Sequence, residues 1–317
     1  YSALRTLEPS SAIDTNNTAI GYNASYYLTT GYENTTLGGN AGKDMTTGYR
    51  NALVGYRAGL NILTGNSNVV LGANALYAAD GAETGNVAVG YAALYSLNSD
   101  STTSNTAVGY AAGYDLTTGQ QNTFIGSNSG VNCTDSIQNV AIGSGALATN
   151  TESNVNTAVG VNALYALNEN ADNANVAIGY LSGRYITTGA DNSTLGAHSG
   201  VNITTGDQNT AIGRYALGSN SSAAISGAGN NTMGYKAGCK IEGTAHTNTL
   251  IGSEAGAEIT TGNQNVGLGR KACGGSAAAA LTNATGNVCV GYYSGQLLQG
   301  AAHENVLIGT AAGYTQS

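Results

Sequence analysis

Charged residues, tryptophan, phenylalanine and proline are scarce or absent in this sequence. Lys, Arg, Asp and Glu make up only 9% of the 317 residues, whereas they account for roughly a quarter of a typical soluble protein. Tryptophan is absent, and the chain has one phenylalanine and one proline, Pro9. Solubility must therefore depend on Asn, Thr, Ser and the peptide backbone rather than on charge.

Long apolar runs are also missing. No stretch is long enough to span a bilayer, and no charged segment followed by an apolar one marks a signal peptide, so we expect no direct insertion into a membrane. The net charge is −8, and the ten Lys and Arg are scattered along the sequence rather than clustered. Because binding to DNA or RNA needs a basic stripe that displaces counterions from phosphates, we expect no nucleic-acid partner.

Residue patterns typical of catalysis are absent too. His198, His246 and His303 occur singly, and carboxylates never pair at a repeating position. The many Gly-rich strings belong to repeated turns rather than to a phosphate-binding loop. We therefore predict that the chain is not an enzyme and binds no cofactor.

The four cysteines form neither a CxxC pair nor a zinc-binding pattern, so we expect no metal site. Their positions favour a role as small apolar core residues that replace Ala or Gly. One pair lies in adjacent sequence repeats, which leaves a disulfide between Cys273 and Cys289 open. The other two cysteines are Cys133 and Cys239.

What the sequence has in place of these features is one motif, Asn-x-x-aliphatic-Gly, that occurs seventeen times. Nine of the sixteen intervals between copies are 17 residues, and the others run from 18 to 22. A period this short suits one coil of a solenoid, and each unit must stack on its neighbours because it is too small to bury a core alone. We predict an all-β, parallel β-roll or β-solenoid of about 17 coils over residues 17–317, preceded by an end segment or linker over residues 1–16. The repeat asparagines are Asn17, Asn34, Asn51, Asn68, Asn86, Asn105, Asn122, Asn139, Asn156, Asn175, Asn192, Asn209, Asn230, Asn248, Asn265, Asn287 and Asn305.

Positions 2 to 4 of the repeat, counted from the Asn, predict a short β-strand. They are rich in Val, Ile and Thr and are bounded by Asn and Gly. Positions 2 and 4 share one face of the strand, and position 3 takes the other. Neither face is charged, and position 3 holds residues such as Leu53 and Phe124, so we expect both faces to be covered. One face can be the coil interior, and the second requires another layer, which predicts an oligomer.

Other positions of the repeat predict how a coil closes. Position 8 is Ala or Ser in every copy, which indicates a tightly packed interior. Position 9 is usually Gly or Leu, and we expect the Leu residues to anchor bulges in longer coils. An aliphatic-Thr-Thr-Gly run such as residues 116–119 predicts a second short strand that ends in a glycine turn, giving two strands per coil. The repeat asparagines are expected to form a structural ladder along the stack.

Tyrosine is the one abundant aromatic residue, with twenty copies. Tyr combines a flat apolar face with a hydroxyl group, which suits contact with a glycan or a protein, although covering the turns is an equally open role. Six tyrosines occupy position 10: Tyr26, Tyr77, Tyr95, Tyr114, Tyr165 and Tyr314. The candidate surface-binding residues are the seven at position 6: Tyr22, Tyr56, Tyr91, Tyr110, Tyr180, Tyr235 and Tyr292.

Motif copies such as Asn-Thr-Ala-Val-Gly at 105–109 and Asn-Val-Ala-Ile-Gly at 139–143 resemble the head repeats of YadA-like trimeric autotransporter adhesins. They are also similar to the Asn-Thr-Ala-Ile-Gly repeats of long phage tail fibres. The resemblance covers residues 17–313, with coils longer than those of the adhesin head. It implies a left-handed roll, three chains around one axis, and attachment to a host surface.

Three functional hypotheses follow. The first is a non-enzymatic, fibrous surface-attachment protein, a homotrimer on the outside of a cell or virion, which binds a glycan or protein receptor through many weak contacts. The second is a structural subunit of an extracellular filament assembled by end-to-end stacking of coils. The third is ice binding by the Thr-Thr rows, which insertions such as residues 80–84 and 219–228 interrupt.

Overall fold

The computed structural model describes residues 2–5, 15–169, 171–218, 223–274 and 281–314, and within them the chain is an all-β parallel solenoid without helices. The chain forms two compact units, Tyr1–Val155 and Asn156–Ser317. Most of the predicted end segment, namely residue 1 and residues 6–14, lies outside the described part. The fold class is therefore the one that the repeat predicts.

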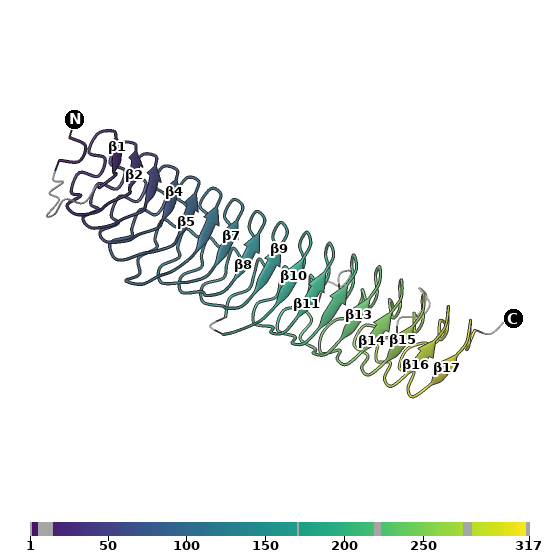
Figure 1. Cartoon of the computed structure of the whole chain (residues 1–317). Helices are drawn as coiled ribbons and strands as arrows, with labels where there is room; N and C mark the ends of the chain where they lie inside the picture. Colours follow the sequence, from purple (N-terminus) through teal and green to yellow (C-terminus); the bar gives the residue numbers. More distant parts are fainter. Residues whose placement is uncertain (1, 6–14, 170, 219–222, 275–280, 315–317) are drawn as a thin grey trace. The chain divides into compact units, whose positions relative to one another are not determined.

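Each described coil contains one three-residue strand, at positions 2 to 4 of its repeat (Figure 1). A coil carries the number of its strand. The strands of the first unit are β1 (Thr18–Ile20), β2 (Thr35–Leu37), β3 (Ala52–Val54), β4 (Val69–Leu71), β5 (Val87–Val89), β6 (Thr106–Val108), β7 (Thr123–Ile125) and β8 (Val140–Ile142). Those of the second unit are β9 (Thr157–Val159), β10 (Val176–Ile178), β11 (Ser193–Leu195), β12 (Thr210–Ile212), β13 (Asn231–Met233), β14 (Thr249–Ile251), β15 (Val266–Leu268), β16 (Val288–Val290) and β17 (Val306–Ile308).

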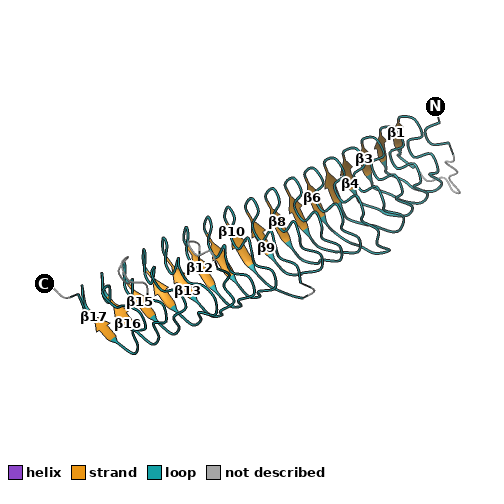
Figure 2. Ribbon diagram, turned by 180° about the vertical axis from the view of Figure 1, so that it is seen from behind, coloured by secondary structure: helices purple, strands orange, loops and turns teal. Residues whose placement is uncertain are grey.

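Neighbouring strands within each unit pair in parallel and in register. Thr106 lies opposite Thr123 and Val108 opposite Ile125, so each side chain meets the same repeat position in the next coil. The strands of each unit lie side by side in one sheet, as Figure 2 shows from behind. In-register stacking converts every position of the repeat into a row of like side chains.

The second strand predicted for each coil is wrong. The aliphatic-Thr-Thr-Gly segments form bends, and pairing near them is limited in the described residues to isolated bridges such as Ile203 with Ile225. The Thr side chain competes with a regular ladder for the backbone. Both the backbone N–H and Oγ1 of Thr117 donate to the carbonyl of Thr134, at 2.8 and 3.2 Å. One carbonyl therefore accepts two hydrogen bonds. Individual hydrogen bonds of this kind, rather than a regular strand ladder, hold the segment against the next coil.

The core of each coil lies behind the strand. Position 3 points inward and is fully buried at Leu53 and Phe124, as the sequence predicts, and the small side chains at position 8 are buried beside it. Large and small residues alternate between positions 3 and 9. A Cβ atom on Gly113 would lie 2.8 Å from Cδ2 of Phe124 in the next coil. A large residue at position 3 therefore requires Gly at position 9 of the coil before it.

Leu at position 9 is the reverse case. Four of these five leucines share a coil with Ala at position 3, so the Leu side chain fills the space that Ala leaves. All five are fully buried even though their φ angles are positive, between 47° and 54°, a conformation that leucine rarely adopts. Their burial offsets the backbone strain. These residues are Leu76, Leu94, Leu147, Leu164 and Leu217.

The repeat asparagines form a buried ladder within each unit. The backbone N–H of Asn122 donates to Oδ1 of Asn105 at 2.9 Å, and Nδ2 of Asn122 donates to the same oxygen at 3.1 Å. Nδ2 also donates to the carbonyl of Ser136, 2.7 Å away, at the end of its own coil. Each Asn therefore joins two coils and closes its own. The second unit repeats the arrangement, for example from Asn192 to Asn175.

The glycine at position 5 allows the coils to approach each other. Gly38 has a φ of 137°, and a Cβ atom there would lie 2.7 Å from the carbonyl carbon of Gly55 in the next coil. No side chain fits in that space, and the φ angle is one that L-residues seldom adopt. Both constraints explain why Gly occupies this position in every copy.

We predict that Gly38→Ala destabilises the first unit by about 3–5 kcal/mol, because it adds both steric overlap and backbone strain. Gly39→Ala is the matched control, since the nearest atom to its Cβ is a ring carbon of Tyr56 at 3.5 Å. Chemical denaturation, followed by circular dichroism, measures both variants. Equal stability of the two would contradict the stacking argument.

We predict that Asn122→Ala destabilises the first unit by about 3 kcal/mol, because it leaves the buried N–H of Asn139 and the carbonyl of Ser136 without a partner. Amide hydrogen exchange should increase most in coils 6 to 8, since each coil depends on its neighbours. Asn98→Ala, at an exposed position of the same unit, should change exchange little. If coils 6 to 8 exchanged equally fast in the two variants, the Asn ladder would contribute nothing to the stability of these coils.

Candidate binding surfaces

The outward face of the strands is uncharged and partly exposed, with Ile, Leu, Val or Met at position 4 and mainly Val or Thr at position 2. Positions 2 and 4 point away from the coil interior, and Leu71 and Ile178 are 49% and 39% exposed. No charged residue occupies either position in any of the seventeen copies. We call the side chains at positions 2 and 4 of each unit its strand face. Contiguous apolar surface of this kind marks an interaction site, and the chain itself supplies no second layer for it among the described residues.

The position-6 tyrosines follow the strand directly and are 44–58% exposed. The structure brings only one adjacent pair of them together, Tyr91 and Tyr110, whose rings stack 5.4 Å apart. The other five are too far apart to stack, because no other two neighbouring coils both carry Tyr at position 6. Apart from that pair, the position-6 tyrosines of each unit are therefore separate exposed rings rather than one continuous ladder.

The position-10 tyrosines are arranged differently. Tyr77, Tyr95 and Tyr114 stack in succession with ring centroids 4.9 Å apart, and all three are half-buried. Burial raises the pKa of Tyr114. Stacked rings that are partly covered serve the packing of the coil edge. The two tyrosine positions thus differ, and position 6 offers the more accessible rings.

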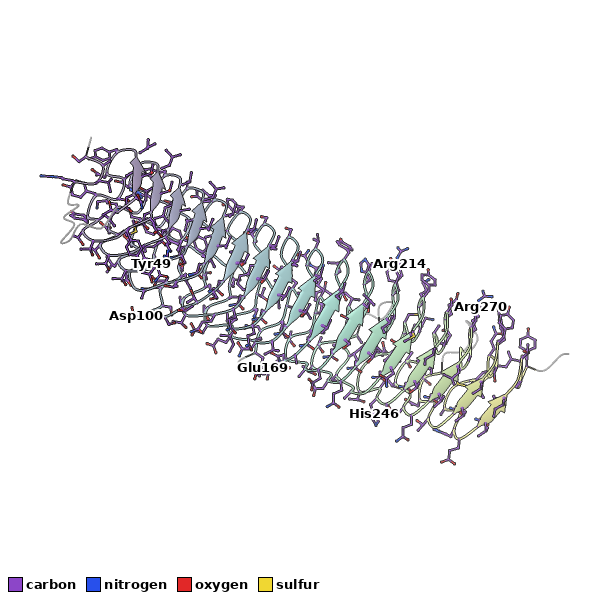
Figure 3. The ribbon with its side chains drawn as sticks, viewed as in Figure 1. Tyr49, Asp100, Glu169, Arg214, His246 and Arg270 are labelled. Carbon is purple, nitrogen blue, oxygen red and sulfur yellow. A yellow bond between two sulfur atoms is a disulfide. The ribbon has the colours of Figure 1, made fainter. Side chains whose placement is uncertain are left out.

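Lys and Arg are scattered along the sequence, but those of the second unit cluster in the fold. All six in the second unit fall in repeat positions 6 to 11, the loop that follows the strand. Figure 3 shows Arg214 and Arg270 along one edge and Glu169 and His246 along the opposite edge. Aligning the sequence on the repeat Asn would have found this clustering. The six residues are Arg184, Arg214, Lys236, Lys240, Arg270 and Lys271.

Acidic residues of the second unit lie mainly on the other edge. Six of its eight Asp and Glu follow position 12 of their repeats. The remaining two pair with bases of the loop edge. Glu258 lies 2.6 Å from Nζ of Lys240, and Glu254 lies 3.4 Å from Nζ of Lys271. Apart from these two ion pairs, the bases and acids of this unit lie on opposite edges.

An open hollow of about 290 Å³ lies on the loop edge of coils 16 and 17. Tyr292, Tyr293 and Tyr314 line it together with Gln296. The side-chain oxygen of Gln296 is buried and has no hydrogen-bond partner among the described residues. Three aromatic rings and a polar oxygen give this hollow the character of a contact site rather than a catalytic centre.

Two titratable side chains off the loop edge, Glu83 and His246, have defined partners among the described residues. Glu83 is buried, and burial raises its pKa, while the backbone N–H groups of Ser99 and Gly81 donate to its oxygens at 2.7 and 3.2 Å. Nδ1 of His246 lies 2.7 Å from Oδ1 of Asn263. In the described ranges no three His, Cys, Asp or Glu side chains lie close enough together to hold a metal ion.

A disulfide joins Cys273 and Cys289, whose Cα atoms lie 5.5 Å apart. The disulfide that the sequence leaves open is therefore present, and both cysteines are buried in the core. Cys273 is at position 9 of coil 15 and Cys289 at position 3 of coil 16, the same two positions that meet at Gly113 and Phe124. The contact between position 9 of one coil and position 3 of the next is therefore the signal that identifies Cys273 and Cys289 as bonding partners.

Cys133 and Cys239 are buried, as predicted, and neither belongs to a disulfide among the described residues. Burial raises the pKa of Cys133 to about 12, so its thiol is protonated and unreactive at neutral pH.

No protein-family model matches the chain, and no curated protein matches it. None of the described residues belongs to a helix that could cross a membrane. The candidate surfaces are thus defined by geometry alone: an uncharged strand face, a loop edge with tyrosines and bases, and an acidic edge opposite.

We predict that iodoacetamide at pH 8 without reductant modifies no cysteine of the native protein, because every thiol is either buried or bonded. Unfolding without reductant should expose two reactive thiols, and unfolding with reductant should expose four. Mass spectrometry counts the added groups. Four modified cysteines in the unreduced, unfolded protein would contradict the disulfide.

Proposed function

We propose that the chain is a non-enzymatic, fibrous attachment protein that associates with copies of itself through the strand face and binds a surface through the loop edge. The observation that carries the proposal is the exposed, uncharged strand face of both units. A monomer would leave rows of Val, Ile and Leu in water. Burial of this surface against copies of the same chain stabilises it by about 25 cal/mol per Å².

Three features of the strand face support self-association. It has no charged residue, so identical faces do not repel each other. It follows the strands of each unit from end to end, so its area grows with every coil. Association there also leaves the loop edge accessible, because the turn at position 5 separates the strand from the exposed Tyr at position 6. A homotrimer of this kind would present each binding row three times.

The disulfide supports an extracellular location. Cys273 and Cys289 are bonded in the core of the second unit, and such bonds form and persist in oxidising compartments. Attachment to a cell or virion exterior fits that setting. The receptor is a surface glycan or protein, and exposed Tyr side chains provide the contacts.

A structural filament is the second candidate. Among the described strands, β1 pairs only with β2 and β17 only with β16. Each therefore leaves backbone groups on one side for another strand. End-to-end stacking would extend the solenoid without using the strand face.

Ice binding has less support. The hydroxyls of Thr29, Thr117 and Thr187 donate to backbone carbonyls of neighbouring coils at 3.0, 3.2 and 3.2 Å. The first Thr of these rows is therefore engaged within the protein.

Sedimentation equilibrium over a range of concentrations tests the proposal, and we expect a closed trimer. Leu71→Lys, Val108→Lys and Ile142→Lys together should give a folded monomer, because three charges on alternate coils would have to be buried in the interface. The matched control places three lysines at exposed apolar positions off the strands: Leu63→Lys, Ile137→Lys and Val161→Lys. It should remain a trimer.

A solution mass other than that of a trimer would distinguish the attachment protein from the structural filament. Open-ended growth that the strand-face lysines do not reduce would favour the filament. A wild-type protein that is monomeric at all concentrations would contradict self-association through the strand face.

A further inference from the structure

A strip of aromatic and basic side chains crosses coils 10 to 13 on the loop edge. The ring of Tyr180 lies 5.3 Å from that of His198, which in turn lies 5.1 Å from the ring of Tyr215. Tyr235 continues the series, 6.4 Å from Tyr215. Four successive coils thus each contribute a ring to one continuous row. We call Tyr180, His198, Arg214, Tyr215, Tyr235 and Lys236 the aromatic–basic strip.

The bases of the strip lie on its rings and carry no ion pair. The guanidinium carbon of Arg214 is 4.6 Å from the centre of the Tyr215 ring, and Nζ of Lys236 is 5.3 Å from the centre of the Tyr235 ring. Neither base lies within ion-pair distance of a carboxylate among the described residues. Stacking on a ring orients a cation while leaving its other side accessible.

Bases outnumber acids around the strip although the chain is acidic overall, and the nearest acids in the repeat, Glu254 and Glu258 of coil 14, pair with Lys271 and Lys240. Positions 6 to 11 of coils 10 to 13 contain Arg184, Lys240 and the two bases of the strip, and no Asp or Glu. The pKa of His198 is lowered, first by burial and then by repulsion from Arg214 and Arg184. The charges therefore act on a common region of the surface.

We propose that the aromatic–basic strip binds an acidic polysaccharide, whose sugar rings lie on the tyrosines and whose carboxylate or sulfate groups meet Arg214 and Lys236. This assignment rests on the attachment function proposed above and names its ligand class. Tyr rings offer flat apolar faces to sugar rings and hydroxyls to sugar oxygens. The row runs across stacked coils about 4.8 Å apart, so it suits an extended chain rather than a compact ligand.

Charge density favours a polysaccharide over nucleic acid. Duplex DNA carries one negative charge about every 1.7 Å, whereas the strip offers at most one base per coil, or about one every 4.8 Å. A polymer with acidic groups on only some of its sugars matches that spacing. The acidic edge of the same coils would repel a thick, densely charged duplex but not a single thin chain.

The test measures binding of the full-length protein to polygalacturonate, dextran sulfate, neutral dextran and duplex DNA at two salt concentrations. Arg214→Gln with Lys236→Gln should weaken binding to the two acidic polysaccharides about ten-fold and flatten its salt dependence. Lys43→Gln with Arg50→Gln is the matched control, because it removes the same charge from the first unit. Circular dichroism and solution mass should stay unchanged in both variants.

A third variant, Tyr180→Ser with Tyr235→Ser, separates the ligand class from the attachment function. If it loses polysaccharide binding while the Arg214 and Lys236 variant does not, the tyrosine edge binds surfaces and the acidic ligand class is wrong. Binding to DNA that exceeds binding to both acidic polysaccharides would overturn the assignment in favour of nucleic acid. Failure to bind either acidic polysaccharide would also overturn it, and strand-face association would then still be judged by the solution mass.

Discussion

Close, in-register stacking of parallel coils is the constraint on which the rest of this structure depends. At position 5 the backbones of successive coils approach so closely that only Gly fits. At position 1 an Asn amide and a backbone N–H share one oxygen of the coil before. These two positions fix the spacing and the register. Every other position then repeats along the stack, and its chemistry becomes a row.

Positions that stacking constrains were predictable from the sequence, because the constraint repeats seventeen times. The strand at positions 2 to 4, the buried side chain at position 3 and the small residue at position 8 all follow from period and residue type. The second strand was not predictable in this way. A Thr-rich segment has high strand propensity, but a Thr hydroxyl that bonds a neighbouring carbonyl holds the chain in a bend.

Features that depend on pairs of positions were harder to predict. The Cys273–Cys289 bond requires the knowledge that position 9 of one coil meets position 3 of the next. The clustering of bases on the loop edge requires alignment by coil, because 17 to 22 residues separate residues that become neighbours. The wide spacing of Lys and Arg along the sequence therefore hides their clustering in the folded second unit. Residues have to be compared by their position within the repeat before a surface cluster of bases can be recognised.

The division between constrained and free positions also indicates where specificity can reside. Gly at position 5 cannot change without moving the next coil, whereas position 6 holds Tyr, Arg, Ser, Thr, Ala, Val or Gly in different coils. Variation at position 6 costs little stability, because no residue at that position is buried, whereas position 7 has a positive φ in every copy. A row of weak contacts gains affinity by repetition, so a few tyrosines and bases at coil spacing can recognise an extended ligand without a deep pocket. The core of the solenoid sets the spacing of that row, and the loop edge sets what the row binds.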